Sequence, residues 1–109
     1  MIVRTWHGLV PTSKSEAYRN FLNERAIPDY QSVKGNLGVY ILERREGEVT
    51  HFITLTFWDS LETIRGFAGD EIEAAKYYDE DKDFLIEFEP NAIHYEVVGQ
   101  SHNADSHLP

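Results

Sequence analysis

Two histidines and one tyrosine are the side chains in this sequence best suited to proton chemistry. His7 and His94 lie in apolar segments near the two ends of the chain. Histidine titrates close to neutral pH, so either residue can accept a proton from a phenol or a carbon acid. Tyr77 is a candidate hydrogen-bond donor, because a buried phenol needs a partner. These three are the candidate catalytic residues, although each histidine can equally serve as a hydrogen-bonding residue at a strand surface or a subunit interface.

Large aromatic side chains are the second feature with chemical meaning. The predicted walls of a pocket for a flat aromatic ligand are Trp58, Phe67, Tyr18 and Phe84, with Phe21, Tyr77 and Tyr78 as further candidates. Ligand pockets are lined mainly by apolar and aromatic side chains. Aromatic residues at helical and strand spacing also build ordinary cores. The pattern therefore fits either a pocket or a packed core.

The histidines do not predict a metal site. His51 would add a third imidazole to His7 and His94, but no His-x-His spacing occurs. Metal ligands must converge within a few ångströms. His51 opens its segment beside a turn, so we expect it to lie away from the other two. We predict neither a metal nor another cofactor.

An acidic stretch imitates the start of a calcium-binding loop without completing it. Asp79, Asp81 and Asp83 have the alternate spacing of such a loop. Phe84 stands where the loop needs glycine, and Pro90 stands where it needs a bidentate carboxylate. An EF-hand is therefore excluded.

Strand patterns occupy four segments. Alternating or β-branched residues are found at Ile2 to Val10, Val39 to Arg45, Val49 to Trp58, and Ala92 to Val98. The second and third segments are separated by Glu46-Gly47-Glu48, which predicts a hairpin.

Helical patterns lie between these strands. Ser13 to Glu16 reads as a capping box, and apolar spacing predicts a helix to about Arg25, with Pro28 breaking the pattern. Asp59 or Ser60 is expected to cap a second helix.

The second helix carries Leu61, Ile64, Phe67 and Ala68 and ends at Gly69. Asp70 and Glu73 predict a further short helix with Ile72, Ala75 and Tyr78.

This order predicts an α+β fold, the ferredoxin-like βαββαβ arrangement of a four-stranded antiparallel sheet with helices on one face. The first and last strands are neighbours in such a sheet. Their numbering then allows His7 and His94 to lie close together.

Both faces of the predicted sheet carry bulky apolar groups, whereas the helices can cover only one. A bare apolar face is unfavourable by roughly 25 cal/mol per Å². We therefore expect a homodimer packed through its sheet faces, with Trp6 at the dimer contact.

Length and charge exclude several classes of protein. The chain has 109 residues, a formal charge of −9 and no cysteine. We expect one domain at 1–99 and a flexible C-terminal tail at 100–109.

Nine carboxylates within residues 70–89 would repel a phosphate backbone, so no nucleic-acid partner is expected. With no apolar run of about 20 residues and no signal peptide, we expect no membrane partner and a cytoplasmic location.

The chain resembles the dimeric α+β-barrel superfamily, in particular the antibiotic-biosynthesis-monooxygenase-like domains. The resemblance covers residues 1–99 and rests on five segments: Val3-Arg4-Thr5-Trp6-His7-Gly8, Gly38-Val39-Tyr40, Phe57 to Phe67, Tyr77-Tyr78 and His94-Tyr95-Glu96-Val97. It implies a pocket in each subunit between the sheet and the second helical region. It also implies oxidation of an aromatic substrate without metal or flavin, in which the protein deprotonates a phenol and stabilises the anion.

The leading prediction is a cofactor-independent monooxygenase-like enzyme acting on a small aromatic or polyketide-type metabolite. A non-catalytic small-molecule-binding or stress-response protein is the first alternative, and a haem-binding relative with altered ligation is the second. The haem-degrading branch resembles the chain through Ala74-Ala75 and the tryptophan-led helix. Its strand asparagine, helix tryptophan and iron-ligating histidine match His7, Phe67 and Tyr77, so all three differ.

Overall fold

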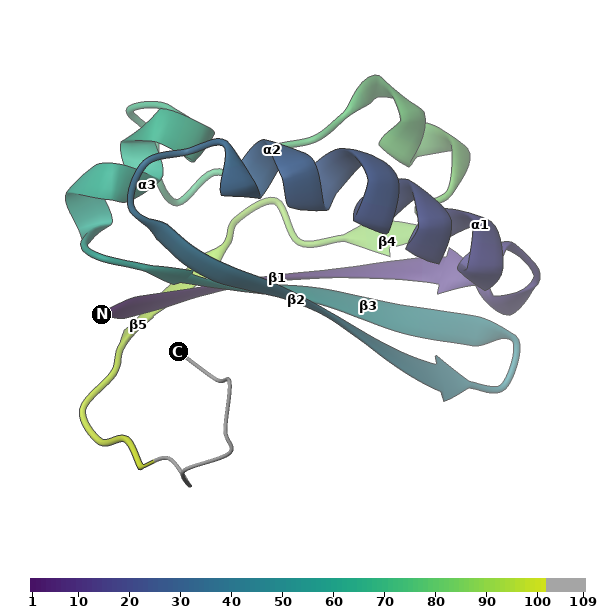
Figure 1. Ribbon diagram of the computed structural model, residues 1–109. Coiled ribbons are helices and arrows are strands. Elements are labelled where there is room, and N and C mark those ends of the chain that lie inside the picture. The colour runs from purple at the N-terminus through teal and green to yellow at the C-terminus, as the bar shows by residue number, and fades with distance from the viewer. Residues whose placement is uncertain (102–109) are drawn as a thin grey trace.

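The computed structural model describes residues 1–101 as an antiparallel sheet with all of its helices on one face (Figure 1). The strands are β1 (Ile2–Pro11), β2 (Asn36–Glu46), β3 (Val49–Trp58), β4 (Glu87–Phe88) and β5 (Ile93–Glu96). Their order is β2-β3-β1, and both β4 and β5 pair with the remaining edge of β1. The ferredoxin-like prediction is confirmed.

The last strand of the ferredoxin-like sheet is divided into two pieces along β1. β4 pairs with Gly8 and Leu9, whereas β5 pairs with Ile2 through Thr5. Pro90 lies between the pieces and cannot donate a ladder hydrogen bond, which explains the interruption. The predicted strand at 92–98 is correctly located but shorter. The hairpin joining β2 and β3 has the predicted position.

The first helical region is longer than the sequence indicates. A short 3₁₀ turn, η1 (Thr12–Lys14), leads into α1 (Ser15–Phe21), a π-helical segment η2 (Leu22–Ala26) and α2 (Ile27–Gln31). The prediction that this region ends near Arg25 is wrong. Pro28 lies in the first turn of α2, where a missing amide is tolerated, and the wide π turn precedes it.

The capping box predicted for Ser13 and Glu16 is also absent. No side chain caps α1, and Ser15 Oγ instead donates to the carbonyl of Thr12 at 2.8 Å. The preceding 3₁₀ turn already satisfies the first amide groups of this region.

The second helix confirms its predicted cap. α3 (Leu61–Ala68) begins after Ser60, whose hydroxyl accepts from the Thr63 amide at 3.4 Å. The helix predicted after Gly69 is wrong. Backbone groups there bond across to the segment before β5, with Ala75 N donating to Pro90 O at 3.0 Å and Ala92 N donating to Glu73 O at 2.8 Å. The acidic stretch forms a short 3₁₀ helix, η3 (Asp79–Asp83).

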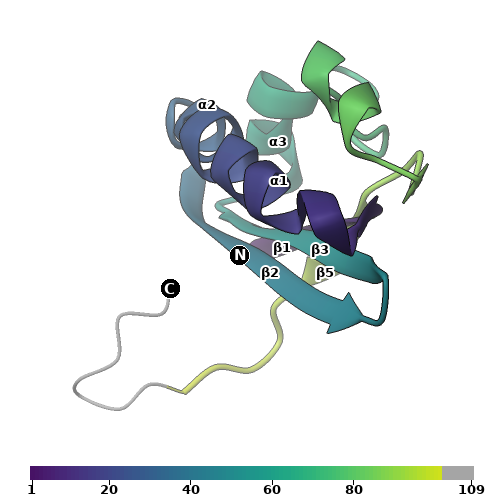
Figure 2. The same ribbon diagram turned by 90° about the vertical axis from the view of Figure 1, so that its right-hand side faces the viewer.

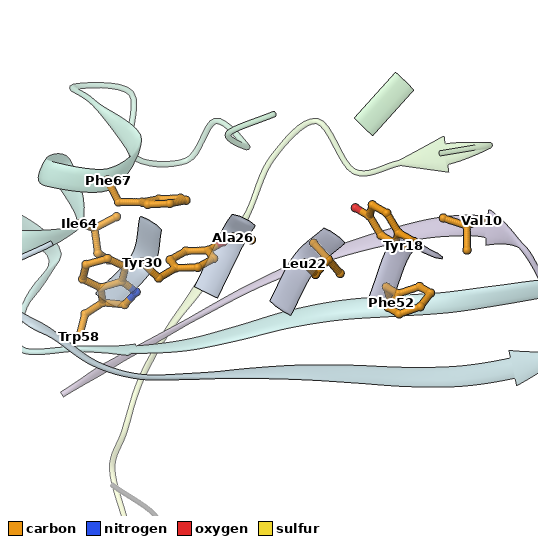
Figure 3. Packing of buried hydrophobic residues seen from close by; sticks show 9 residues of the cluster. All are labelled: Val10, Tyr18, Leu22, Ala26, Tyr30, Phe52, Trp58, Ile64 and Phe67. Carbon is orange, nitrogen blue, oxygen red and sulfur yellow. The ribbon is translucent and has the colours of Figure 1, made fainter. Parts of the chain in front are cut away.

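Figure 2 shows the helices as one layer above the sheet, and the buried hydrophobic core lies between these two layers. Figure 3 shows two groups of side chains within it. Tyr30, Trp58, Ile64 and Phe67 form one group near α3, and Val10, Tyr18, Leu22 and Phe52 form the other near α1.

The faces of β1 are assigned by burial. Arg4, Trp6 and Val10 lie under the helices, whereas His7 and Leu9 lie on the helix-free face. The expectation that Trp6 lies on the helix-free face is wrong, since its side chain is 8% exposed beneath the helices. A shift of one residue exchanges the two faces of a strand, and both faces of β1 carry large groups. Among the described residues, no helix is long and apolar enough to cross a membrane.

Candidate functional site

The two predicted catalytic histidines lie on opposite faces of the sheet. His94 on β5 stands directly opposite Arg4 on β1, on the helix side. His7 points to the helix-free face, where its Nε2 lies 2.8 Å from Nδ1 of His51. The expected approach of His7 to His94 is therefore wrong. His51, which we expected to lie away from the other histidines, is the direct neighbour of His7.

Tyr77 lies at the rim of the helix side, and its phenol is already engaged. Its hydroxyl donates to the Glu89 carbonyl and accepts from Trp6 Nε1 at 3.4 Å. Burial raises the pKa of Tyr77. As a neutral phenol it can donate, but its donor is occupied by the backbone.

The four predicted pocket-wall residues divide between the two groups of the core. Trp58 and Phe67 lie near α3, with ring centroids 6.2 Å apart. Tyr18 and Phe84 lie near α1, with centroids 5.1 Å apart. Trp58 and Tyr18 are completely buried. The four residues thus flank the space between the two groups and do not enclose a single hollow.

A small cavity whose wall includes charged side chains lies in that space. It measures about 20 Å³, which is room for about one water molecule. It is lined by Arg4, Trp6, Tyr18, Leu22, Ala26, Tyr30, Thr54, Lys76, Tyr78 and Asp81. This enclosed volume is much smaller than the pocket for a flat aromatic ligand that the sequence predicts.

Arg4 is the most unusual group in the cavity wall. Its side chain is almost fully buried, at 2% exposure, and it forms no ion pair with any carboxylate of the described residues. One guanidinium nitrogen donates to the Ala74 carbonyl at 3.0 Å, while Nε has no partner. The guanidinium carbon also lies 5.4 Å from the centre of the Phe67 ring. A buried cation without a counter-ion is strongly unfavourable unless an anion reaches it.

His94 adds a second unsatisfied nitrogen beside Arg4. Its Nε2 is buried and has no hydrogen-bond partner among the described residues. Burial and the charge of Arg4 lower the pKa of His94. The imidazole is therefore neutral at neutral pH and is able to accept a proton.

Hydrogen-bonded phenols complete the cavity wall. Tyr18 donates to Asp81 Oδ1 at 3.1 Å, and Tyr30 donates to Thr54 Oγ1 at 3.5 Å. Burial raises the pKa of Tyr18 and of Tyr30, and the nearby Arg4 charge partly offsets the shift for Tyr30. Both phenols are therefore neutral donors at physiological pH.

Three side chains close the cavity toward solvent, and we call them the Asp29 latch. Asp29 Oδ2 accepts from Lys76 Nζ at 2.7 Å and from the Tyr78 hydroxyl at 2.6 Å. Burial alone would raise the pKa of Asp29, but these two hydrogen bonds outweigh it and lower the pKa. Lys76 and Tyr78 also line an open groove of about 620 Å³ on the outer side. The latch is thus the partition between the groove and the cavity.

Sequence reasoning missed Arg4, Asp81 and the latch. For Arg4 a signal existed, because it shares the alternation of Trp6 and Val10, which are large and buried on the helix side of the same strand. No comparable signal marks Asp81, which lies in a run of exposed carboxylates. The latch joins residues 47 and 49 positions apart in the sequence.

The fold matches those of solved structures. A candidate antibiotic biosynthesis monooxygenase from Bacillus cereus superposes with a TM-score of 0.68 at 14% identity, covering 94% of this chain and 97% of that one. A similar protein from Nitrosomonas europaea gives 0.67 at 17% identity, covering 91% and 100%. The haem-degrader MhuD of Mycobacterium tuberculosis, with two haems in its active site, gives 0.65 at 20% identity, covering 94% and 100%.

The sequence matches no protein-family model, and no curated protein matches it. At these identities the structural matches establish the fold. The chain has the fold of the antibiotic-biosynthesis-monooxygenase-like domains, as its sequence motifs predict.

Proposed function

We propose that the protein binds a small aromatic molecule with an ionisable hydroxyl between its sheet and helices, and oxidises it with dioxygen without a cofactor. The observation that carries this proposal is the buried guanidinium of Arg4, which has no counter-ion and an unpartnered Nε within residues 1–101. A phenolate oxygen is an anion that would satisfy it. The monooxygenase-like fold supports the same chemistry.

In the proposed reaction, the anion is the species that reacts with dioxygen. His94, held neutral beside Arg4, accepts the phenol proton, and Arg4 stabilises the resulting phenolate. The substrate supplies all four electrons to dioxygen. A phenol with a free para C–H and one O₂ give a quinone and one water, so one oxygen atom enters the product and the other leaves as water.

Binding requires the Asp29 latch to open. The enclosed cavity of about 20 Å³ cannot hold an aromatic ring, whereas the groove beyond Lys76 and Tyr78 is about 620 Å³. The latch belongs in part to the irregular segment after α3, which has few regular backbone hydrogen bonds to break. Displacing it would join the two spaces, with Trp58, Phe67, Tyr18 and Phe84 as aromatic walls.

We further propose a homodimer through the helix-free face of the sheet. Exposed apolar residues on that face include Tyr40, Leu42, Ile93 and Tyr95. Burying such a patch against a second copy is favourable at roughly 25 cal/mol per Å². The absence of cysteine favours the reducing cytoplasm as the place of action.

The residues present do not fit a haem of the kind named for MhuD. Tyr77 occupies the position matched to the iron ligand, and its phenol is held by Glu89 and Trp6. Trp6, a bulky side chain, fills the helix side of β1. We therefore expect haem titration to give no shifted Soret band.

Oxygen uptake with a panel of quinone-forming hydroxyarenes tests the proposal. We expect one quinone per O₂ with the unaltered protein and a loss of at least about tenfold in Arg4→Gln and in His94→Gln. His7→Gln on the opposite face is the matched control and should retain activity. If the arenes bind but no variant or parent consumes oxygen, the protein is a binding protein and the enzymatic proposal is wrong.

A further inference from the structure

His7 and His51 form a cluster of ionisable groups that the proposed reaction does not use. They project from the adjacent strands β1 and β3, where His7 pairs with Ile53 and His51 pairs with Leu9. They are thus diagonal neighbours on the helix-free face. His7 Nε2 and His51 Nδ1 lie 2.8 Å apart, and the two rings are inclined by 31°.

Each ring also has an outer nitrogen that faces a carboxylate. His7 Nδ1 lies 3.7 Å from Glu89 Oε1, and His51 Nε2 lies 3.4 Å from Glu46 Oε1. An ionised carboxylate only accepts hydrogen bonds, so each outer nitrogen is favoured as an N–H. A neutral imidazole carries one N–H, which leaves both inner nitrogens with lone pairs that point toward one another.

One neutral arrangement makes both hydrogen bonds of His51, with His7 Nε2 donating to His51 Nδ1 and His51 Nε2 donating to Glu46. It leaves the lone pair of His7 Nδ1 facing the Glu89 carboxylate at 3.7 Å. Moving one proton to an inner nitrogen makes the inner hydrogen bond, but it turns an outer lone pair toward Glu89 or Glu46. A cation held between the inner nitrogens removes the conflict. Metal-bound histidines commonly have this pattern, since the ring nitrogen away from the ion donates to a carboxylate.

We propose that His7 Nε2 and His51 Nδ1 bind a divalent transition-metal ion of the Zn²⁺ class, with Glu89 and Glu46 orienting the two rings. Zn–N bonds of about 2.0–2.1 Å at a tetrahedral angle separate two ligand nitrogens by about 3.3 Å. The inner nitrogens must then move apart by about half an ångström from 2.8 Å, and both rings must turn so that their lone pairs converge on the ion. The His7 side chain is 35% exposed and has room to do so.

The site would be open, with two protein nitrogens. Within residues 1–101, no group of three or more histidine, aspartate or glutamate side chains is arranged to hold a metal. In the single chain, a hollow of about 290 Å³ lined in part by Leu42 and Ile53 adjoins the two rings. It has space for the water molecules that would complete the coordination shell.

Isothermal titration of the full chain with Zn²⁺, and the visible spectrum of added Co²⁺, test this site. His102 and His107 could bind metal independently, so both are changed to glutamine in the background used for every variant. We expect one ion per chain in that background and no binding after His7→Asn or His51→Asn. Glu46→Gln and Glu89→Gln should each weaken binding about tenfold or more. Glu48→Gln in the same hairpin is the matched control and should change nothing.

Three outcomes would overturn the proposal. Zn²⁺ binding that disappears in the tail-substituted background would place the metal elsewhere. Binding unaffected by His51→Asn would exclude the pair. Absence of binding, with the two imidazoles titrating by NMR as a coupled pair, would mean that a shared proton is the cation. If a histidine variant fails to fold, the Glu46→Gln and Glu89→Gln variants still test the site. The number of ions bound per chain can be measured in the same way for a monomer and for a dimer.

Discussion

Arg4 and His94 face one another across β1 and β5, and each has a buried nitrogen without a hydrogen-bond partner in the described part of the chain. Most buried polar groups in proteins are satisfied. Arg4 also lines the small cavity beneath the helices, so its buried positive charge favours a ligand that carries negative charge.

Replacing Arg4 by methionine should stabilise the free protein. The guanidinium is buried, and no carboxylate of the described residues pairs with it, so its removal relieves a desolvation penalty while the aliphatic part of the side chain is kept. We expect the free energy of unfolding to rise by about 1 kcal/mol in urea denaturation. Arg65→Met on the exposed face of α3 should change it by less than about 0.5 kcal/mol. A strongly destabilised Arg4→Met variant would show that Arg4 is chiefly structural.

Asp81→Asn should alter how stability depends on pH. Burial raises the pKa of Asp81, partly offset by hydrogen bonds from the Tyr78 amide and the Tyr18 hydroxyl. A raised folded-state pKa gives stability that is complete below the ordinary carboxyl pKa and is lost as pH rises through the folded value. Asparagine cannot ionise, so it does not lose this stability. The difference in free energy of unfolding between the variant and the parent should therefore shift in favour of the variant as the pH rises from about 3 to about 7.

Urea denaturation at the two pH values measures this difference. Asp83→Asn in the same 3₁₀ helix is exposed and serves as the control, with little change expected at either pH. Equal pH dependence in the parent and in Asp81→Asn would contradict the prediction.

Gly35→Ala should be much more destabilising than Gly47→Ala. Both glycines have positive φ, 96° and 63°. A Cβ at Gly35 would lie 2.4 Å from Cβ of Thr63 in α3, whereas no atom lies within 4 Å of one at Gly47. We expect a loss of about 1 kcal/mol at Gly47 from backbone strain and at least about twice that at Gly35. Thermal unfolding of the two variants measures these losses of stability. Equal losses would show that α3 can move away from a side chain at position 35 at little cost.

Leu42→Glu should convert the proposed dimer to a monomer. Leu42 is 42% exposed and pairs with Ile53 on the helix-free face. A carboxylate buried in an apolar interface is unfavourable by several kcal/mol. Light scattering after size exclusion should give the dimer mass for the parent and for Leu61→Glu, an equally exposed position on α3, but the monomer mass for Leu42→Glu. A monomeric parent at high concentration would exclude the proposed interface.

The sequence predicts the frame of the fold through local signals. Three features are determined by residues close together in the sequence. They are the alternation in β1 and β3, the glycine turn between β2 and β3, and the cap at Ser60 before α3. The secondary-structure predictions are wrong where contacts with distant segments determine the local conformation. The helix expected after Gly69 is replaced by backbone pairing with residues 90–92, which no local pattern can reveal.

The candidate site is less accessible to sequence reasoning for the same reason. Trp6 and His7 are adjacent bulky residues, and only the packing of the helices decides which of them is covered. The proximity of His7 to His51 depends on the register of two strands. Whether a described carboxylate lies near Arg4 depends on the folded structure and cannot be read from the sequence.

The bound-state pKa of a chromogenic phenol is the most direct measure of the central role proposed for Arg4. A phenol such as 4-nitrophenol, whose phenolate absorbs at a separate wavelength, is titrated over pH in the presence of the parent, Arg4→Gln and the control Arg65→Gln. An opposite charge within a few ångströms lowers such a pKa by about one unit or more. We expect this decrease with the parent and Arg65→Gln, and its loss in Arg4→Gln. An equal bound-state pKa in all three proteins would contradict the account.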